Sequence, residues 1–167
     1  IDHPEAELDE ICQFIKGPDF PTGGVIMGRS GIRAAYATGR GKIKVRAKTE
    51  IVDLPNGKSQ IVITEIPYMV NKARLVESMA NLVKDKRVEG ITNIQDHSSR
   101  EGMQIVVDVR RDANAQVILN QLFTYSQLED TISMIHIALV PGAGGKLQPR
   151  VLTLRQILDQ YIGFQKD

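Results

Sequence analysis

The sequence has little of several features that would assign it to a function class. It contains a single cysteine, Cys12, so no internal disulfide can form, which fits a reducing compartment. No apolar run approaches the roughly 20 residues that span a membrane, and no signal peptide is visible. The formal net charge is only +1, with 21 basic and 20 acidic residues. Any affinity for nucleic acid must therefore come from local clustering of charge.

Motifs of common catalytic and metal sites are also missing. The sequence has no phosphate-binding P-loop, no GxSxG and no Cys/His zinc spacing. Asp96 and His97 share one turn, but two potential ligands without a third do not predict a metal site. Cys12 and His136 lie in apolar patterns and are predicted to pack in the interior. We therefore predict no catalytic residue, metal or cofactor in this chain.

Apolar periodicity and turn residues predict a mixed α+β domain. Helices are expected over 4–15, 30–38, 71–87, 113–124 and 153–165, and strands over 25–27, 42–53, 59–66, 91–95, 103–109 and 131–140. Ser30 and Asn71 are candidate N-caps. Asn56 followed by Gly57 indicates a β-hairpin, and residues 141–149 read as a loop.

From residue 59 the elements follow the order strand, helix, strand, strand, helix, strand, which is the split βαβ (ferredoxin-like) pattern. We predict a mostly antiparallel sheet with helices on one face, a basic hairpin strand at one side and flanking helices at both termini. The turn-rich stretch GPDFPTGG at 17–24 is the best internal boundary. The chain opens at Ile1 directly in helical sequence, which indicates a segment of something longer.

The most informative local pattern is KIKVRAK at 42–48. In a strand, alternate residues share a face, so the basic side chains should line one side and the small apolar ones the other. Same-face residues recur at roughly 6.6–6.8 Å, about twice the 3.4 Å phosphate step of one DNA strand. The candidate phosphate-binding residues are therefore Arg40, Lys42, Lys44, Arg46 and Lys48, with Arg29 and Arg33 as possible additions.

Two other interpretations compete with DNA binding. Lysines on a solvated edge strand also prevent aggregation, so the chain could be a structural and interaction module. A stand-alone RNA-binding domain would need aromatic residues on its central strands for base stacking. Strands 61–66, 91–95 and 103–109 contain no aromatic residue, which ranks this alternative last.

Several long stretches, taken in succession, resemble the A subunits of bacterial type IIA DNA topoisomerases, meaning those of DNA gyrase or topoisomerase IV. They are GPDFPTGG at 17–24, GIRAAYATGRGKIKVRAKTEI at 31–51, IVITEIPYMVNKARLVESMANLV at 61–83 and GMQIVVDVRRDANAQVILNQLF at 102–123. The C-terminal stretch GGKLQPRVLTLRQILDQYI is more similar to gyrase, although the loop VPGAGGKLQPR is longer and richer in glycine than expected.

The resemblance implies a domain layout and a role. Residues 1–24 would be a helix and linker from the winged-helix side, 25–150 the tower domain, and 151–167 a helix leading toward the coiled coil. The tower would form part of a basic floor under the DNA, with the residues from Arg40 to Lys48 near phosphates. The active tyrosine would lie upstream of Ile1, so the piece alone is expected to be inactive.

The resemblance also implies partners. The parent enzyme would change DNA supercoiling by transient double-strand breakage through a phosphotyrosine and by ATP-dependent strand passage. Mg²⁺ and ATP would bind the partner B subunit, within an A2B2 complex that holds double-stranded DNA and includes a second A subunit. A bacterial cytoplasmic, nucleoid-associated location and no membrane contact are expected.

Overall fold

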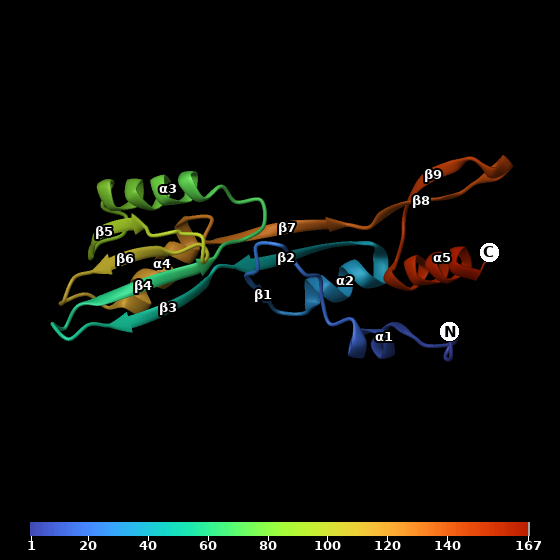
Figure 1. The fold of residues 1–167 in the computed structure, drawn as a ribbon, viewed down its shortest axis with the longest axis horizontal. Coiled ribbons are helices and arrows are strands. Elements are labelled where there is room, and N and C mark those ends of the chain that lie inside the picture. The colour runs from blue at the N-terminus through green and yellow to red at the C-terminus, as the bar shows by residue number, and fades with distance from the viewer. Residues whose placement is uncertain (167) are drawn as a thin grey trace. The chain divides into compact units, whose positions relative to one another are not determined.

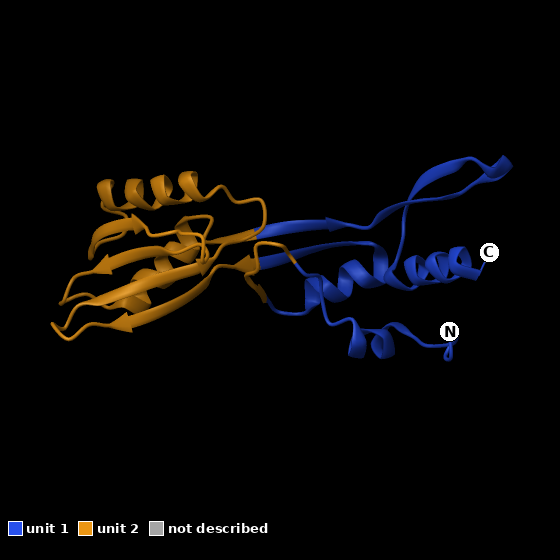
Figure 2. Ribbon diagram, viewed as in Figure 1, with its two compact units in different colours: residues 1–19, 27–44, 131–167 blue, residues 20–26, 45–130 orange. Residues whose placement is uncertain are grey.

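The computed structural model describes residues 1–166 as an α+β chain, which confirms the predicted fold class (Figure 1). The chain divides into two compact units (Figure 2). Unit 1 comprises residues 1–19, 27–44 and those from 131 onward, and unit 2 comprises residues 20–26 and 45–130. Each unit therefore gathers segments that are far apart in the sequence.

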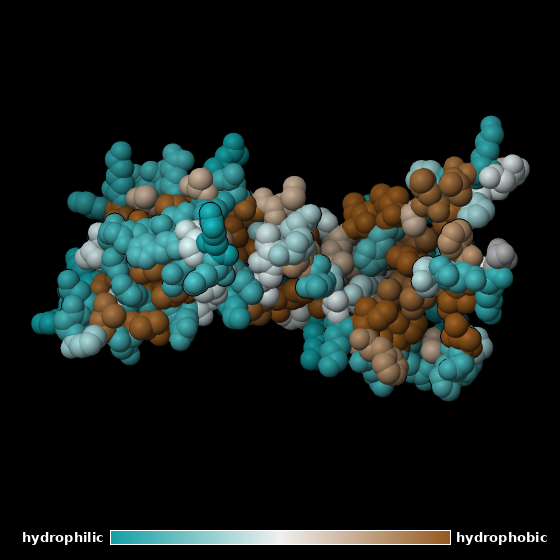
Figure 3. Space-filling model, viewed as in Figure 1, coloured by the Kyte–Doolittle hydropathy of each residue, from teal (hydrophilic) through white to brown (hydrophobic). Residues whose placement is uncertain are grey.

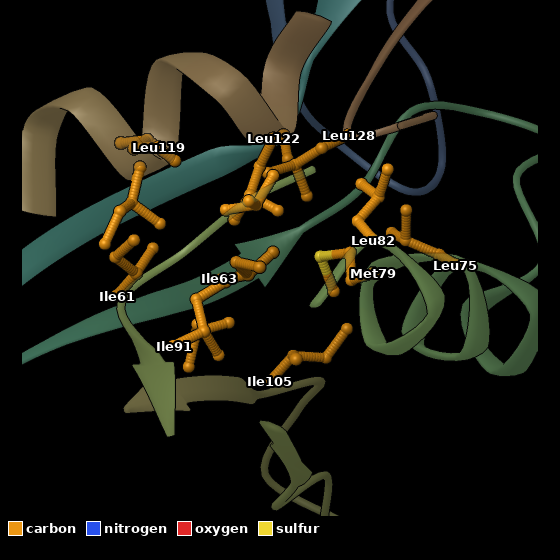
Figure 4. Close-up of a cluster of buried hydrophobic side chains, with 14 of the residues drawn as sticks. Ile61, Ile63, Leu75, Met79, Leu82, Ile91, Ile105, Leu119, Leu122 and Leu128 are labelled. Atoms are coloured by element: carbon orange, nitrogen blue, oxygen red, sulfur yellow. The ribbon is translucent and has the colours of Figure 1, made fainter. Parts of the chain in front are cut away.

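Unit 2 contains a four-stranded antiparallel sheet with the strand order β3-β4-β6-β5. Its elements are β3 (Lys48–Asp53), β4 (Ser59–Glu65), α3 (Lys72–Lys84), β5 (Ile91–Asp96), β6 (Ile105–Val109) and α4 (Ala115–Tyr125). Ile61 pairs with Val107 and Ile63 with Ile105, so these four side chains share a face of the sheet. They are fully buried in one apolar cluster with residues of α3 and α4 (Figure 4). Both helices therefore pack on that face.

Local capping and turn chemistry set the limits of these elements. β3 and β4 form a hairpin around Asn56 and Gly57, as predicted, and Gly57 has a φ of 79°, a conformation that favours glycine. The side chain of Asn71 accepts a hydrogen bond from the Arg74 N–H at 3.0 Å and caps α3, also as predicted. Asn114 caps α4 in the same way.

The described part of unit 1, which ends at residue 166, contains three α-helices and a second hairpin. They are α1 (Leu8–Phe14), α2 (Ser30–Thr38), β8 (Ile137–Pro141), the short 3₁₀ turn η1 (Ala143–Gly145), β9 (Leu147–Val151) and α5 (Leu154–Lys166). α5 contacts both α1 and α2. The guanidinium of Arg155 donates to the carbonyls of Pro4 and Ala6, which ties the first residues of the chain to α5.

A third sheet has the strand order β1-β2-β7. Its strands are β1 (Val25–Met27), β2 (Arg40–Arg46) and β7 (Glu129–Ile135). The predicted strand 42–53 is thus two strands, interrupted at Ala47, and the predicted strand 131–140 is β7 and β8, interrupted at His136. At each interruption the chain passes from one sheet to another.

Three smaller predictions also need correction. Residues 141–149, predicted as a loop, include the start of β9, which pairs with β8. The first helix begins at Leu8 because residues 4 and 5 form a turn. Ser30 is the first residue of α2 and not its cap, since the N-cap is Arg29 and no side-chain hydrogen bond caps this helix.

The element order of the split βαβ pattern is present, but one strand has a different partner. In that pattern the last strand, β7, would join the sheet of β4, β5 and β6. In the structure β7 belongs to the sheet of β1 and β2, and β3 occupies the place beside β4. The basic segment therefore contributes to two sheets, through β2 and through β3.

Candidate nucleic-acid interface

The alternation predicted along the basic strand is present. Ile43, Val45 and Ala47 are at most 4% exposed. Lys42, just before Ile43, and Lys44, between Ile43 and Val45, are exposed. Arg40, at the start of β2, is exposed as well. Burial of the small apolar residues therefore fixes the strand with its basic side chains toward solvent.

The place of β2 in its sheet bears on the edge-strand interpretation. β2 is the middle strand of the order β1-β2-β7, whereas β3, which begins at Lys48, is an edge of the four-stranded sheet. Protection of an unpaired edge can account for a lysine on β3. It does not account for Arg40, Lys42 and Lys44, the three basic residues that β2 contributes to unit 1.

Close backbone packing holds this part of β2 against α2. A Cβ added to Gly31 of α2 would lie 1.9 Å from the carbonyl oxygen of Lys42, and one added to Gly41 would lie 2.5 Å from the carbonyl oxygen of Gly31. Gly39, with a φ of 83°, ends α2 and turns the chain into β2. The lack of side chains at these glycines lets the helix and the strand touch, which fixes the direction of the basic row.

Arg46 is engaged in the fold of unit 2. Its guanidinium donates to the carboxylate of Glu129 and lies 4.6 Å from the ring centroid of Phe123. Neither partner could be inferred from the pattern around Arg46, because both lie about 80 residues away in the chain. Arg46 therefore differs from Arg40 and Lys42, whose side chains make no ion pair within residues 1–166.

The two additional arginines line an open hollow of about 580 Å³ between α1 and the start of α2. Arg33 donates to Asp9 at 2.5 Å, and this hydrogen bond holds the pKa of the Asp9 carboxyl below its usual value. The charge of Arg33 is thus partly compensated. Arg29 and Lys16 line the same hollow, so its surface is basic in balance.

Asp96 and His136, two other residues considered in the sequence, lie beside identifiable neighbours in the structure. Asp96 lies 2.8 Å from the ammonium of Lys72, which holds the pKa of its carboxyl far below the usual value. The ring centroids of His136 and Tyr36 are 5.8 Å apart.

Within residues 1–166, no three His, Cys, Asp or Glu side chains gather as a metal would require. In the same part of the chain, no helix has the length and apolar character for a membrane crossing.

Comparison with known proteins adds a family relationship. The family model for the A subunit of DNA gyrase and topoisomerase IV matches residues 1–167. The chain is 58% identical over 166 residues to the DNA gyrase A subunit of Clostridium acetobutylicum, covering 99% of this chain and 19% of that protein. It is 49% identical to that of Fibrobacter succinogenes (99% and 18%) and 46% identical to that of Streptococcus pneumoniae (100% and 20%). The chain thus spans about a fifth of these relatives.

Proposed function

The chain belongs to the family of DNA gyrase and topoisomerase IV A subunits, and on that premise we propose that it is the DNA-positioning tower segment of such a protein. Residues 25–150 form the tower, residues 1–24 lead in from a winged-helix domain, and residues 151–167 lead toward a coiled coil. Its part is to neutralise phosphates and to support the DNA, while bond chemistry takes place elsewhere in the longer protein.

One observation carries the proposal: an exposed basic row on a middle strand. Arg40, Lys42 and Lys44 extend from β2 on the side opposite its buried apolar residues. Their spacing of roughly 6.6–6.8 Å suits contact with alternate phosphates. Such contacts hold a duplex in place and do not read its sequence.

In this proposal the parent enzyme changes DNA topology by transient double-strand breakage through a phosphotyrosine and by ATP-dependent strand passage. The enzyme is a bacterial cytoplasmic A2B2 complex whose B subunits bind Mg²⁺ and ATP. The tyrosines of this chain do not stand in the arginine-tyrosine-threonine context of the family's nucleophile; they are Tyr36, Tyr68, Tyr125 and Tyr161. The segment alone is therefore inactive in this proposal, and gyrase is favoured over topoisomerase IV as the parent.

A second candidate is a scaffold segment that makes no DNA contact. The engagement of Arg46 with Glu129 and Phe123 favours it, because part of the predicted row serves the fold. The DNA-positioning function and the scaffold function differ in whether Arg40, Lys42 and Lys44 contact DNA.

The deciding experiment is fluorescence anisotropy of a roughly 30-base-pair duplex across a salt series. Three phosphate contacts give a log-log salt slope near −2.7, about −0.9 for each. We expect this slope for the wild-type chain and its loss when Arg40, Lys42 and Lys44 are all changed to alanine.

A matched control separates local from global charge. Changing Lys58, Lys84 and Lys146 to alanine removes the same net charge from positions outside the row. The control should bind as the wild type does. Equal weakening of both variants, or no salt-dependent binding by the wild type, favours the scaffold.

A further inference from the structure

The hairpin of β8 and β9 carries an apolar face that nothing in the described chain covers. In its register Ile137 pairs with Val151, Leu139 with Pro149 and Pro141 with Leu147. Directly paired residues share a face of a sheet, and so do residues two apart on one strand. All six of these side chains therefore lie on one face, and all six are exposed.

The degree of exposure is high for residues of this kind. Ile137, Leu139 and Leu147 are 60%, 66% and 63% exposed. The opposite face carries Arg150 and Gln148, while Val140 on that side is 4% exposed. Arg150 and Gln148 are themselves exposed, so this hairpin leaves an apolar face open to solvent in addition to a polar one, whereas a surface hairpin usually exposes its polar face alone. Figure 3 shows brown, hydrophobic residues gathered over the part of unit 1 that carries this hairpin.

Such a hairpin needs a partner. A two-stranded sheet is at best marginally stable in water without packing against a further element. Contiguous exposed apolar patches on soluble proteins mark interaction sites. The face holds no charged side chain, so it does not suit DNA phosphates.

We propose that this face, formed by Ile137, Leu139, Pro141, Leu147, Pro149 and Val151, is the docking surface for apolar side chains from the remainder of the same polypeptide. The inference rests on the proposed function to the extent that the 167 residues work within a longer A subunit. The relatives leave room for such an occupant, because this chain spans only 19% of the Clostridium acetobutylicum protein.

The size of the face argues against a second copy of this chain as the occupant. Six side chains offer on the order of a few hundred Å², which is less than the roughly 800 Å² per partner of a standard protein interface. Association of two separate molecules must also offset lost translational and rotational freedom. A segment of the same chain does not lose this translational and rotational freedom when it docks, so a face of this size is enough to bind it.

The test is thiol labelling of the full-length protein that contains these residues, in a background without other cysteines. One variant carries Leu139→Cys on the apolar face, and its control carries Gln148→Cys on the other face of the same hairpin. Each labelling rate is divided by the rate in the unfolded protein. We expect the Leu139→Cys variant to be slowed at least tenfold more than the control. Equal slowing of the two variants overturns the proposal.

A second measurement identifies the occupant. A benzophenone reagent attached to the Leu139→Cys variant is illuminated, and the products are separated under denaturing conditions. A cross-link within one chain supports the proposal, whereas a product of twice the chain mass assigns the face to a second copy and overturns it.

A third measurement uses the unmodified protein, in case a cysteine disturbs the hairpin. Hydrogen exchange over residues 137–151 should be slow in the full-length protein, and fast exchange overturns docking. None of these readouts involves DNA. A failed salt-dependence experiment with a protected hairpin therefore removes the DNA role and leaves the docking surface, and the reverse result removes only the latter.

Discussion

The guanidinium of Arg46, at the end of β2, donates a hydrogen bond to the carboxylate of Glu129, at the start of β7. The side chain of Glu129 is 17% exposed and that of Arg46 is 37% exposed. The same guanidinium lies over the ring of Phe123 of α4. Arg46 thus joins a strand, a second strand and a helix within unit 2, while the side chains of Arg40 and Lys42 are exposed and make no ion pair within residues 1–166.

The first prediction is that Arg46 contributes to the stability of the fold, whereas Lys42 contributes to DNA binding. We expect Arg46→Ala to lower the free energy of unfolding by about 1 kcal/mol, because it removes a solvent-screened ion pair and a cation–π contact. We expect Lys42→Ala to leave stability unchanged and to make the DNA salt slope shallower by about 0.9. Urea unfolding and the anisotropy series measure the two effects. A double-mutant cycle with Glu129→Gln isolates the ion pair, and a stability loss for Lys42→Ala equal to that for Arg46→Ala would contradict this division.

The second prediction concerns the contact between α2 and β2. Gly31→Ala places a methyl group where the Lys42 carbonyl oxygen lies 1.9 Å away. Such overpacking against backbone costs about 1–3 kcal/mol. Gly163→Ala in α5 is the matched control, because nothing lies within 4 Å of its added Cβ. There, alanine should raise the free energy of unfolding by about 0.5–1 kcal/mol. Similar effects at the two glycines would mean that α2 does not touch β2 this closely.

The sequence predicts the elements of this chain better than it predicts their partners. The hairpin at Asn56 and Gly57 and the cap at Asn71 are local chemistry, and both are as expected. The break at Ala47 is not local. Ala47 is buried like Ile43 and Val45, so the alternation of buried and exposed residues continues across the point at which the chain passes from one sheet to the other. Periodicity reports which side of a strand is buried and not which strand lies beside it.

The sequence predicts most of β8 within the strand 131–140 but does not predict β9, and the reason is different. Every residue of β9 is exposed, so no alternation between buried and exposed positions follows the strand, and Pro149 lies inside it. Proline and a preceding run of glycines are typical of a loop. For the candidate site, the exposed row on β2 could be predicted from alternation. The pairing of Arg46 with Glu129 could not, since the two are 83 residues apart.

The third prediction is a pH dependence at Asp96. The hydrogen bond from Lys72, with help from Ser98, lowers the pKa of the folded carboxyl below the unfolded value. A lowered folded-state pKa contributes stability that is present above the unfolded pKa of about 3.9 and is lost as the pH falls toward the folded value. We therefore expect Lys72→Met to be less stable than the wild type near pH 6, and the difference to shrink below about pH 4.

Urea unfolding between pH 2 and pH 6 measures that difference. Lys84→Met is a suitable control, because Lys84 lies in the same helix and makes no ion pair within residues 1–166. Its effect should not vary with pH. A Lys72→Met difference that stays constant down to pH 2 would show that the ion pair does not control the titration of Asp96.

The fourth prediction concerns Arg33, whose guanidinium is held by Asp9 at 2.5 Å. The pKa of Asp9 is lowered by that hydrogen bond, so the carboxylate stays ionised near neutral pH and competes with any phosphate for Arg33. Asp9→Asn removes the competing charge. If Arg33 belongs to the DNA-binding surface, duplex affinity should rise and the salt slope should steepen by up to about 0.9.

Glu10→Gln provides the control for this change, since it removes one negative charge from the neighbouring position of α1 and Glu10 makes no ion pair with Arg33. A general gain from higher net charge would appear equally in both variants and would place Arg33 outside the surface. A steeper slope for Asp9→Asn alone identifies Arg33 as a phosphate contact, because only that variant frees a guanidinium. The basic surface would then extend from β2 to α2, since the close contact of Gly31 with the Lys42 carbonyl holds this helix against that strand.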